Sequence, residues 1–247
     1  MPITVDLDVP RRALAVGAHP DDVEFGCGGT LAKWAASGCE IHHVVCTDGS
    51  KGSWDPTQDP SELVAVRRRE QQDASRALGG SGEVTFLNWP DGELASGLRQ
   101  RIQVAACIRR FRPDVILGHD PWKRYRLHPD HRHAGYLVTD GIVAARDPLF
   151  LTELELEPHR PKALLLWEAE EVDHLEDVAD FVDRKIAALL SHRSQHVSTM
   201  GISNEGSEGP DDDEVTRFVA RVHERLAEHG ARAGLRLAEG FKRLDRL

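Results

Sequence analysis

At residues 14–26 the chain reads Leu14-Ala-Val-Gly-Ala-His19-Pro20-Asp21-Asp22-Val-Glu-Phe-Gly26. A short apolar run ends in a histidine, a proline and two adjacent carboxylates, and a glycine-rich segment then leads into an apolar-periodic run. This order predicts a strand, a loop and the start of a helix. Side chains at the carboxyl end of such a strand reach the crevice where open α/β sheets place their sites. We therefore interpret residues 18–22 as the first half of a metal site.

The length and composition of the chain are typical of one large α/β domain. It has 247 residues, of which 40% are hydrophobic, and such domains commonly reach about 250 residues. The formal net charge is −10. Because phosphate binding usually leaves a basic footprint, we expect no nucleic-acid partner.

The cysteines and the N-terminal sequence indicate the cellular compartment in which the protein is expected. The four cysteines form no Cys-x-x-Cys pair, and three of them lie in or beside apolar runs, as reduced core thiols do. The N-terminus lacks the basic region and apolar core of a signal peptide, and no apolar run approaches the ~18 residues of a membrane span. We expect a cytoplasmic protein with no membrane partner.

Strand and helix patterns alternate along most of the chain, without hairpin signals. This alternation predicts an α/β, Rossmann-like, mostly parallel doubly wound sheet. We expect a single domain over 1–247, with a core at 12–167 and an irregular C-terminal part of helices and a loop at 168–247. Polar Gly/Pro-rich stretches at 47–60 and 199–212 are a candidate binding loop and a candidate lid. The predicted strands are 12–17, 40–46, 84–87, 114–117 and 162–167, and the predicted helices are 28–37, 61–78, 98–111, 131–146, 177–190 and 213–229.

A second motif, His128-Pro129-Asp130-His131, follows the fourth predicted strand. A sheet brings this strand end and that of residues 12–17 into one crevice, so the two motifs are expected to meet. One histidine and one carboxylate from the first motif, with one histidine from the second, make a three-ligand site with an open position, the pattern of catalytic zinc. The alternative is that both motifs are only turns that cap helices.

The two motifs resemble the signatures of the LmbE-like, PIG-L superfamily of zinc-dependent N-deacetylases. Further stretches resemble the family in the same order along nearly the whole chain: Thr47-Asp48-Gly49, Arg67-x-x-Glu70, Pro90-Asp91-Gly92, His192-x-Ser194-Gln195 and Ala238-Glu239-x-Phe241. The resemblance implies that His19, Asp22 and His131 bind the metal.

The same resemblance implies the catalytic roles: Asp21 as general base, His128 as general acid, and Asp130 orienting and charging His128. A carboxylate partner would raise the pKa of His128, which could then protonate the leaving amine. Zinc is the expected cofactor. Fe²⁺ stays an alternative, because two histidines and a carboxylate also suit non-haem iron.

Residues on or beside the motif-bearing loops are candidates for holding substrate. They are Asp48, Trp54, Arg67, Trp122, Arg124 and Tyr125, since aromatic rings and a carboxylate suit a sugar and arginines suit an acidic substituent. Loop packing and surface salt bridges are the alternative interpretation of each.

The leading function is therefore removal of acetyl from a small N-acetylated amino-sugar conjugate. An amidase of a thiol conjugate, a metal-dependent hydratase and a non-catalytic metal-binding module are the alternatives. Family resemblance leaves a homo-oligomer open.

Overall fold

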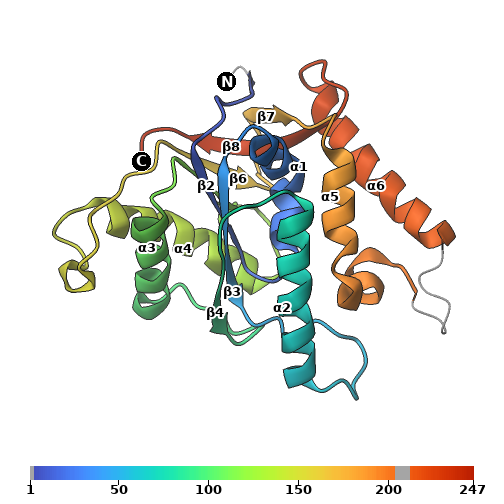
Figure 1. Ribbon diagram of the computed structural model, residues 1–247, viewed down its shortest axis with the longest axis horizontal. Coiled ribbons are helices and arrows are strands. Elements are labelled where there is room, and N and C mark those ends of the chain that lie inside the picture. The colour runs from blue at the N-terminus through green and yellow to red at the C-terminus, as the bar shows by residue number, and fades with distance from the viewer. Residues whose placement is uncertain (1–2, 204–211) are drawn as a thin grey trace.

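The computed structural model describes residues 3–203 and 212–247, and in that part of the chain one sheet holds eight strands (Figure 1). The order across the sheet is β1-β7-β8-β6-β5-β2-β3-β4, and β8 alone among these strands runs antiparallel to its neighbours. The predicted mostly parallel α/β sheet is thus confirmed. Its strands are β1 (Thr4–Val5), β2 (Arg12–Gly17), β3 (Glu40–Thr47), β4 (Val84–Trp89), β5 (Val115–His119), β6 (Ala163–Trp167), β7 (His174–Asp177) and β8 (Ala238–Leu244).

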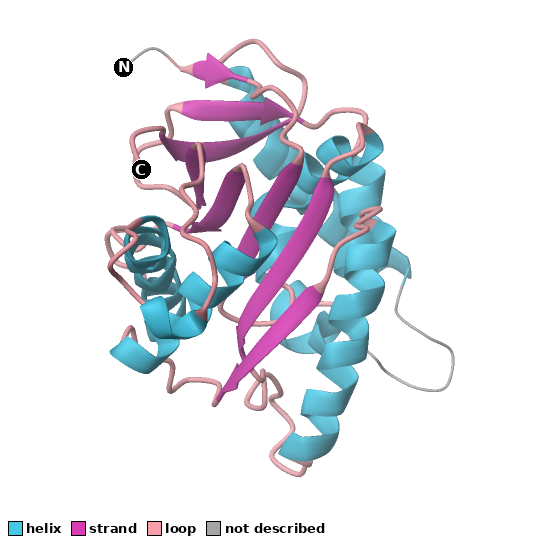
Figure 2. Ribbon diagram, turned by 60° about the vertical axis from the view of Figure 1, so that its left-hand side comes forward, coloured by secondary structure: helices cyan, strands magenta, loops and turns pink. Residues whose placement is uncertain are grey.

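Helices cover both faces of the sheet (Figures 1 and 2). None of the described helices is long and apolar enough to cross a membrane. The α-helices are α1 (Asp22–Ala36), α2 (Pro60–Ala77), α3 (Leu98–Phe111), α4 (Pro129–Arg146), α5 (Val182–Leu190) and α6 (Asp212–Ala231).

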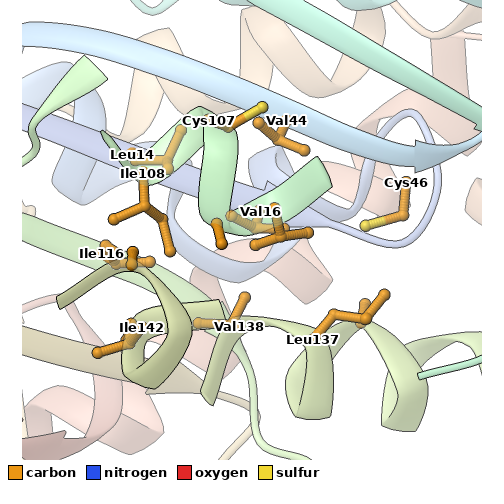
Figure 3. Close-up of a cluster of buried hydrophobic side chains, with 14 of the residues drawn as sticks. Leu14, Val16, Val44, Cys46, Cys107, Ile108, Ile116, Leu137, Val138 and Ile142 are labelled. Atoms are coloured by element: carbon orange, nitrogen blue, oxygen red, sulfur yellow. The ribbon is translucent and has the colours of Figure 1, made fainter. Parts of the chain in front are cut away.

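Strand β2 is buried on both faces, which explains why its sequence is a continuous apolar run. Leu14 and Val16 point into the core under α3 and α4, shown in Figure 3. Ala13 and Ala15 point the other way, into the core under α1 and α5. Successive side chains of a strand alternate between faces, so this one strand contributes to both cores.

The sheet reverses its strand order at β2, which pairs with β3 on one side and β5 on the other. The chain runs outward from β2 through β3 to β4, then returns through α3 to β5. Because both strands are parallel, their carboxyl ends lie side by side at this switch point, where α/β folds place ligands. The segments after Gly17 and after His119 therefore face each other.

The C-terminal part of the chain contributes two strands that the sequence pattern did not predict. Strand β8 pairs with β6 (Trp167 opposite Phe241) and with β7 (Leu175 opposite Gly240). The strand β7 also explains why the helix predicted over 177–190 begins only at Val182. Part of the predicted loop 199–212 lies outside the described residues.

Helix α1 begins earlier than predicted, at Asp22, and is interrupted at Cys27 (φ −149°, ψ 19°). Two buried side chains from distant elements satisfy the polar groups that the break exposes. The Lys185 ammonium donates to the carbonyls of Glu24 and Phe25, at 2.8 Å each. The Glu239 carboxylate accepts from the N–H groups of Gly29 (2.9 Å) and Thr30 (2.7 Å). These bonds replace the missing helical ones, so the break is stable.

Candidate metal centre and active site

Helix starts place the side chains of both motifs. Pro129 begins α4 at a position where its fixed φ and missing N–H suit a helix, so His128 lies at the N-cap and His131 in the first turn. Asp22 lies in the first turn of α1, directly after the N-cap Asp21. The two helix starts meet at the carboxyl ends of β2 and β5.

Three side chains predicted as metal ligands come together there. His19 Nδ1 is 3.2 Å from His131 Nε2 and 3.4 Å from Asp22 Oδ2, and His131 Nε2 is 3.3 Å from Asp22 Oδ1. Ligands at about 2.0–2.1 Å from a tetrahedral zinc ion lie about 3.3 Å from one another. These residues therefore fit such an ion and leave a fourth position open.

Other groupings of side chains around His19 could also hold a metal. They are His19 with His128 and His131, Asp22 with His119 and His131, and His19 with Asp91 and Asp130. All of them lie in the same centre, so the described residues offer one metal-binding region at the switch point.

The second ring nitrogen of His19 lies between two carboxylates. Nε2 is 3.1 Å from both Asp91 Oδ1 and Asp130 Oδ2. A protonated Nε2 leaves Nδ1 unprotonated and facing Asp22 and His131, which is the tautomer that a metal ligand needs. Burial raises the pKa of Asp91, but the hydrogen bond and charge of His19 outweigh it and hold that pKa at about 2.

Asp130 lies against His19, which corrects the prediction that it orients His128. Its carboxylate accepts from the backbone N–H groups of Gly92 (2.7 Å) and Leu94 (3.2 Å) as well as contacting His19. The expected rise in the pKa of His128 is also wrong. Burial and the charge of His19 lower the pKa of His128 and outweigh the opposing charge of Asp130. The segment that contains Gly92 and Leu94 packs against the first turn of α4, which contains Asp130, because of the tertiary fold. No local sequence pattern predicts this contact.

His128 is nevertheless close to the proposed ligands. Its ring centroid is 4.6 Å from that of His19 and 4.8 Å from that of His131. The side chain is exposed to the cavity, which it lines together with Asp21.

Asp21 has a strained backbone and a buried carboxylate. Its φ of 104° is in the left-handed region, and its N–H donates to Gln71 Oε1 at 3.0 Å. Burial raises the pKa of Asp21 to about 6, against the lowering charge of Arg67. Strain of this kind persists only where surrounding contacts impose it, and such residues cluster at active sites.

Arg67 joins the loop that contains Pro20 to the loop that contains Gly49. It is 3% exposed, and its guanidinium donates to the carbonyls of Pro20 (2.6 Å) and Gly49 (3.0 Å). Its Nη2 lies 3.5 Å from Asp21 Oδ2. Arg67 also lines a cavity of about 550 Å³ that opens over the proposed ligands.

Four predicted substrate residues do not line this cavity: Asp48, Trp122, Arg124 and Tyr125. Asp48 accepts from the N–H groups of Ser50 in its own loop and of Asp91 after β4, so it joins two segments. Trp122 and Tyr125 are 56% and 88% exposed and lie away from the cavity walls. The predicted candidate Trp54 lines the cavity, together with Gln195.

Glu168 is a cavity residue that sequence reasoning missed. It follows β6, has a left-handed φ of 52°, and is paired with Arg126, which also contacts His131 Nδ1. Burial raises the pKa of Glu168, but His119 and Arg126 outweigh it and hold that pKa at about 2. A carboxylate at the carboxyl end of a strand next to β5 is a signal that could have found it.

Comparison with known proteins identifies the family of the chain. Residues 14–142 match the family model PIG-L, described as GlcNAc-PI de-N-acetylase. The chain belongs to the PIG-L family. Diacetylchitobiose deacetylase of Thermococcus kodakarensis is 30% identical over 94% of this chain and 84% of its own length.

Two further PIG-L comparisons cover most of the chain. A 1D-myo-inositol 2-acetamido-2-deoxy-alpha-D-glucopyranoside deacetylase of Thermomonospora curvata is 30% identical over 87% of this chain and 77% of its own. The solved N,N′-diacetylchitobiose deacetylase of Pyrococcus horikoshii, in complex with an inhibitor, superposes with a TM-score of 0.84 at 28% identity, over 96% of this chain and 84% of its own. These relatives are N-deacetylases of sugar conjugates.

Proposed function

We propose that this protein is a metal-dependent hydrolase that removes the acetyl group from an N-acetylated amino-sugar conjugate. The observation that carries the proposal is the pairwise approach of His19 Nδ1, His131 Nε2 and one or other oxygen of Asp22 to 3.2–3.4 Å, with the buried carboxylate of Asp21 next in the chain. Family membership supports the reaction class, since the similar proteins named above are sugar N-deacetylases.

His19 Nδ1, His131 Nε2 and Asp22 would hold the ion, with zinc as the first candidate and Fe²⁺ as the alternative. When bound, such an ion polarises the amide carbonyl and lowers the pKa of water at the open position to about 7. Binding through Nε2 leaves Nδ1 of His131 protonated. The guanidinium of Arg126, which contacts that nitrogen, would then turn away from it and keep its pair with Glu168.

Asp21 is the proposed general base. Its carboxylate lines the cavity, and Gln71 and Arg67 hold its backbone and side chain in place. A pKa raised towards neutrality makes a carboxylate a better proton acceptor near the working pH. Asp21 would therefore take the proton of the attacking water.

His128 is the proposed general acid. The amine of a collapsing tetrahedral intermediate leaves readily only when protonated, and His128 is exposed to the cavity where it can reach that nitrogen. Asp130 would act through His19, by holding its Nε2–H and so the orientation of the ring.

The cavity suits a sugar conjugate. Its volume of about 550 Å³ is within the usual range for ligand sites, and its wall combines the indole of Trp54 with charged and amide groups that can bind hydroxyls. Arg67 also lies at this wall, and it is a predicted substrate residue that we propose contacts the substrate there.

The test is metal analysis of the purified protein, followed by acetate release from a panel. The panel is N,N′-diacetylchitobiose, an N-acetylglucosaminyl inositol and, as a non-sugar control, N-acetylglycine. We expect bound zinc and release of acetate from the sugar conjugates alone. Zinc-loaded protein that releases acetate from none of them would contradict the proposed hydrolase.

A further inference from the structure

The two oxygens of Asp22 have different neighbours. Oδ2 accepts from the backbone N–H of His19 at 2.7 Å and lies 3.2 Å from His119 Nε2, and it is also 3.4 Å from the proposed ligand atom His19 Nδ1. A carboxylate oxygen has two lone-pair positions, so two donors saturate Oδ2 and leave Oδ1 free. Oδ1 is the atom that faces His131 Nε2.

Trp167 determines which nitrogen of His119 is protonated. The indole N–H of Trp167 donates to His119 Nδ1 at 3.0 Å. Indole is a donor only, so Nδ1 has to accept, and a neutral ring then carries its proton on Nε2. That proton points at Asp22 Oδ2, which at 3.2 Å is closer to Nε2 than the Ala18 N–H at 3.4 Å, itself a donor.

Packing holds this arrangement in place. His119 and Trp167 are 2% and 1% exposed and lie opposite each other at the ends of β5 and β6. Gly26 lets the indole approach, because a Cβ there would lie 2.5 Å from the ring. The buried indole N–H of Trp167 is a fixed donor, so it selects the tautomer of His119. Arg126, the donor beside His131 Nδ1, has a long side chain at the cavity wall and does not select the tautomer of His131 in this way.

We propose that His119 is a positioning residue for the metal ligand Asp22. As the Nε2–H tautomer selected by Trp167, it holds Oδ2, so that Asp22 binds the ion through Oδ1 alone. This inference rests on the proposed function, because it presupposes an ion between His19, Asp22 and His131. It also excludes His119 as a ligand, since a ligating Nε2 would leave a proton on Nδ1 pointing at the indole N–H.

The first test reads the tautomer in metal-free protein. Long-range ¹H–¹⁵N spectra of histidine-labelled protein distinguish protonated from unprotonated ring nitrogens, and the His119→Gln variant assigns the signals. We expect an unprotonated Nδ1 and a protonated Nε2. In Trp167→Phe the ring is released, and we expect the proton to move to Nδ1, which faces Glu168 Oε2 at 3.8 Å. A wild-type His119 with its proton on Nδ1 would overturn the proposal.

The second test measures Zn²⁺ affinity by competition with a chromophoric chelator. Loss of a group that orients a ligand typically weakens binding roughly 10–100-fold, which we expect for His119→Ala. His119→Gln, whose amide N–H reaches the position of Nε2, should bind within about threefold of wild type. His133→Ala, in α4, where the ring contacts Ser96, is the control and should not change affinity.

The outcomes separate the two proposals. A wild-type protein that binds no Zn²⁺ would contradict the proposed function, and the inference with it. Wild-type binding that His119→Ala leaves unchanged would overturn the inference alone. If His119→Ala does not fold, Trp167→Phe tests the same point, with an expected loss of affinity that is smaller but in the same direction.

Discussion

The adjacent carboxylates Asp21 and Asp22 have opposite electrostatic surroundings. Burial raises the pKa of Asp21 to about 6, because the neighbouring cation Arg67 offsets only part of the desolvation. Burial acts on Asp22 in the same direction, but His131 and His119 outweigh it, and the pKa of Asp22 lies well below its ordinary value. Neighbouring titratable groups whose pKa values are pushed apart are typical of divided roles in catalysis. This difference supports Asp22 as the proposed ligand and Asp21 as the proposed base.

Replacing Asp21 by Asn should remove the base without removing a ligand. We expect zinc content equal to wild type and a kcat lower by roughly 10²–10⁴-fold, the usual contribution of general base catalysis. Elemental analysis and acetate release measure the two quantities. Asp55→Asn, an exposed loop carboxylate outside the cavity, is the control. Loss of zinc in Asp21→Asn would show that Asp21 is a ligand.

Asp114, far from the site, provides a test of stability against pH. Its carboxylate accepts from the N–H groups of Arg11 (3.0 Å) and Arg12 (3.2 Å) and pairs with Lys162. Burial raises the pKa of Asp114, but these contacts outweigh it and lower the pKa. A folded pKa below the unfolded one stabilises the protein above about pH 4 and ceases to do so as the pH falls through the folded value.

Asp114→Asn should therefore lower the free energy of unfolding by about 0.5–1 kcal/mol at pH 7, a value reduced for solvent screening. The difference from wild type should shrink at about pH 3. Urea unfolding at both pH values measures it. A difference that is equal at both would show that the charge of Asp114 does not contribute.

At the scale of elements, the break in α1 decides where the first motif lies. The short first segment, from Asp22 to the break at Cys27, holds Asp22 at the carboxyl end of β2. Lys185 from α5 and Glu239 from β8 form a buried pair at 2.7 Å that joins the two halves of the helix. The last third of the chain thus supports the geometry of its first motif.

Lys185→Met should destabilise the protein by about 3–5 kcal/mol, because it leaves the Glu239 carboxylate buried without its cation. The double variant Lys185→Met with Glu239→Gln should lose less, since no unpaired charge remains. Denaturant unfolding of the single and double variants gives the coupling energy. Additive losses would mean that the pair acts only as two separate hydrogen-bonding groups.

At the scale of the molecule, the site forms only when the sheet forms. His19 and His131 are 112 positions apart in the chain, and the switch point between β2 and β5 brings them to 3.2 Å. A ligand that binds only the folded state stabilises it, so metal binding and folding are linked.

Zinc at 100 times its dissociation constant should stabilise the fold by about 2.7 kcal/mol. For a domain of this size that is roughly a 5–10 °C rise in Tm. Chelation should reverse the rise, and His131→Ala should abolish it. Thermal unfolding followed by circular dichroism, with and without zinc, measures the shift. A full zinc-dependent rise in His131→Ala would contradict His131 as a ligand.

Local sequence was sufficient for several features of this protein. Apolar runs predicted the central strands, and Pro129 and the turn residues placed His128 and His131 at a helix start. These features depend on neighbours within a few residues, where periodicity and turn chemistry act. Two ligand-type motifs at two strand ends were enough to predict that they meet, because parallel strands of one sheet share an edge.

Only the tertiary structure decided what each motif residue touches. Asp130 contacts His19 instead of His128, Arg67 clamps two loops, and Glu239 bridges the break in α1. Each of these contacts joins segments that are far apart in sequence, and packing selects among several polar partners of similar chemistry. A pattern of residue types contains no information on that choice, because the competing partners differ in position and not in kind.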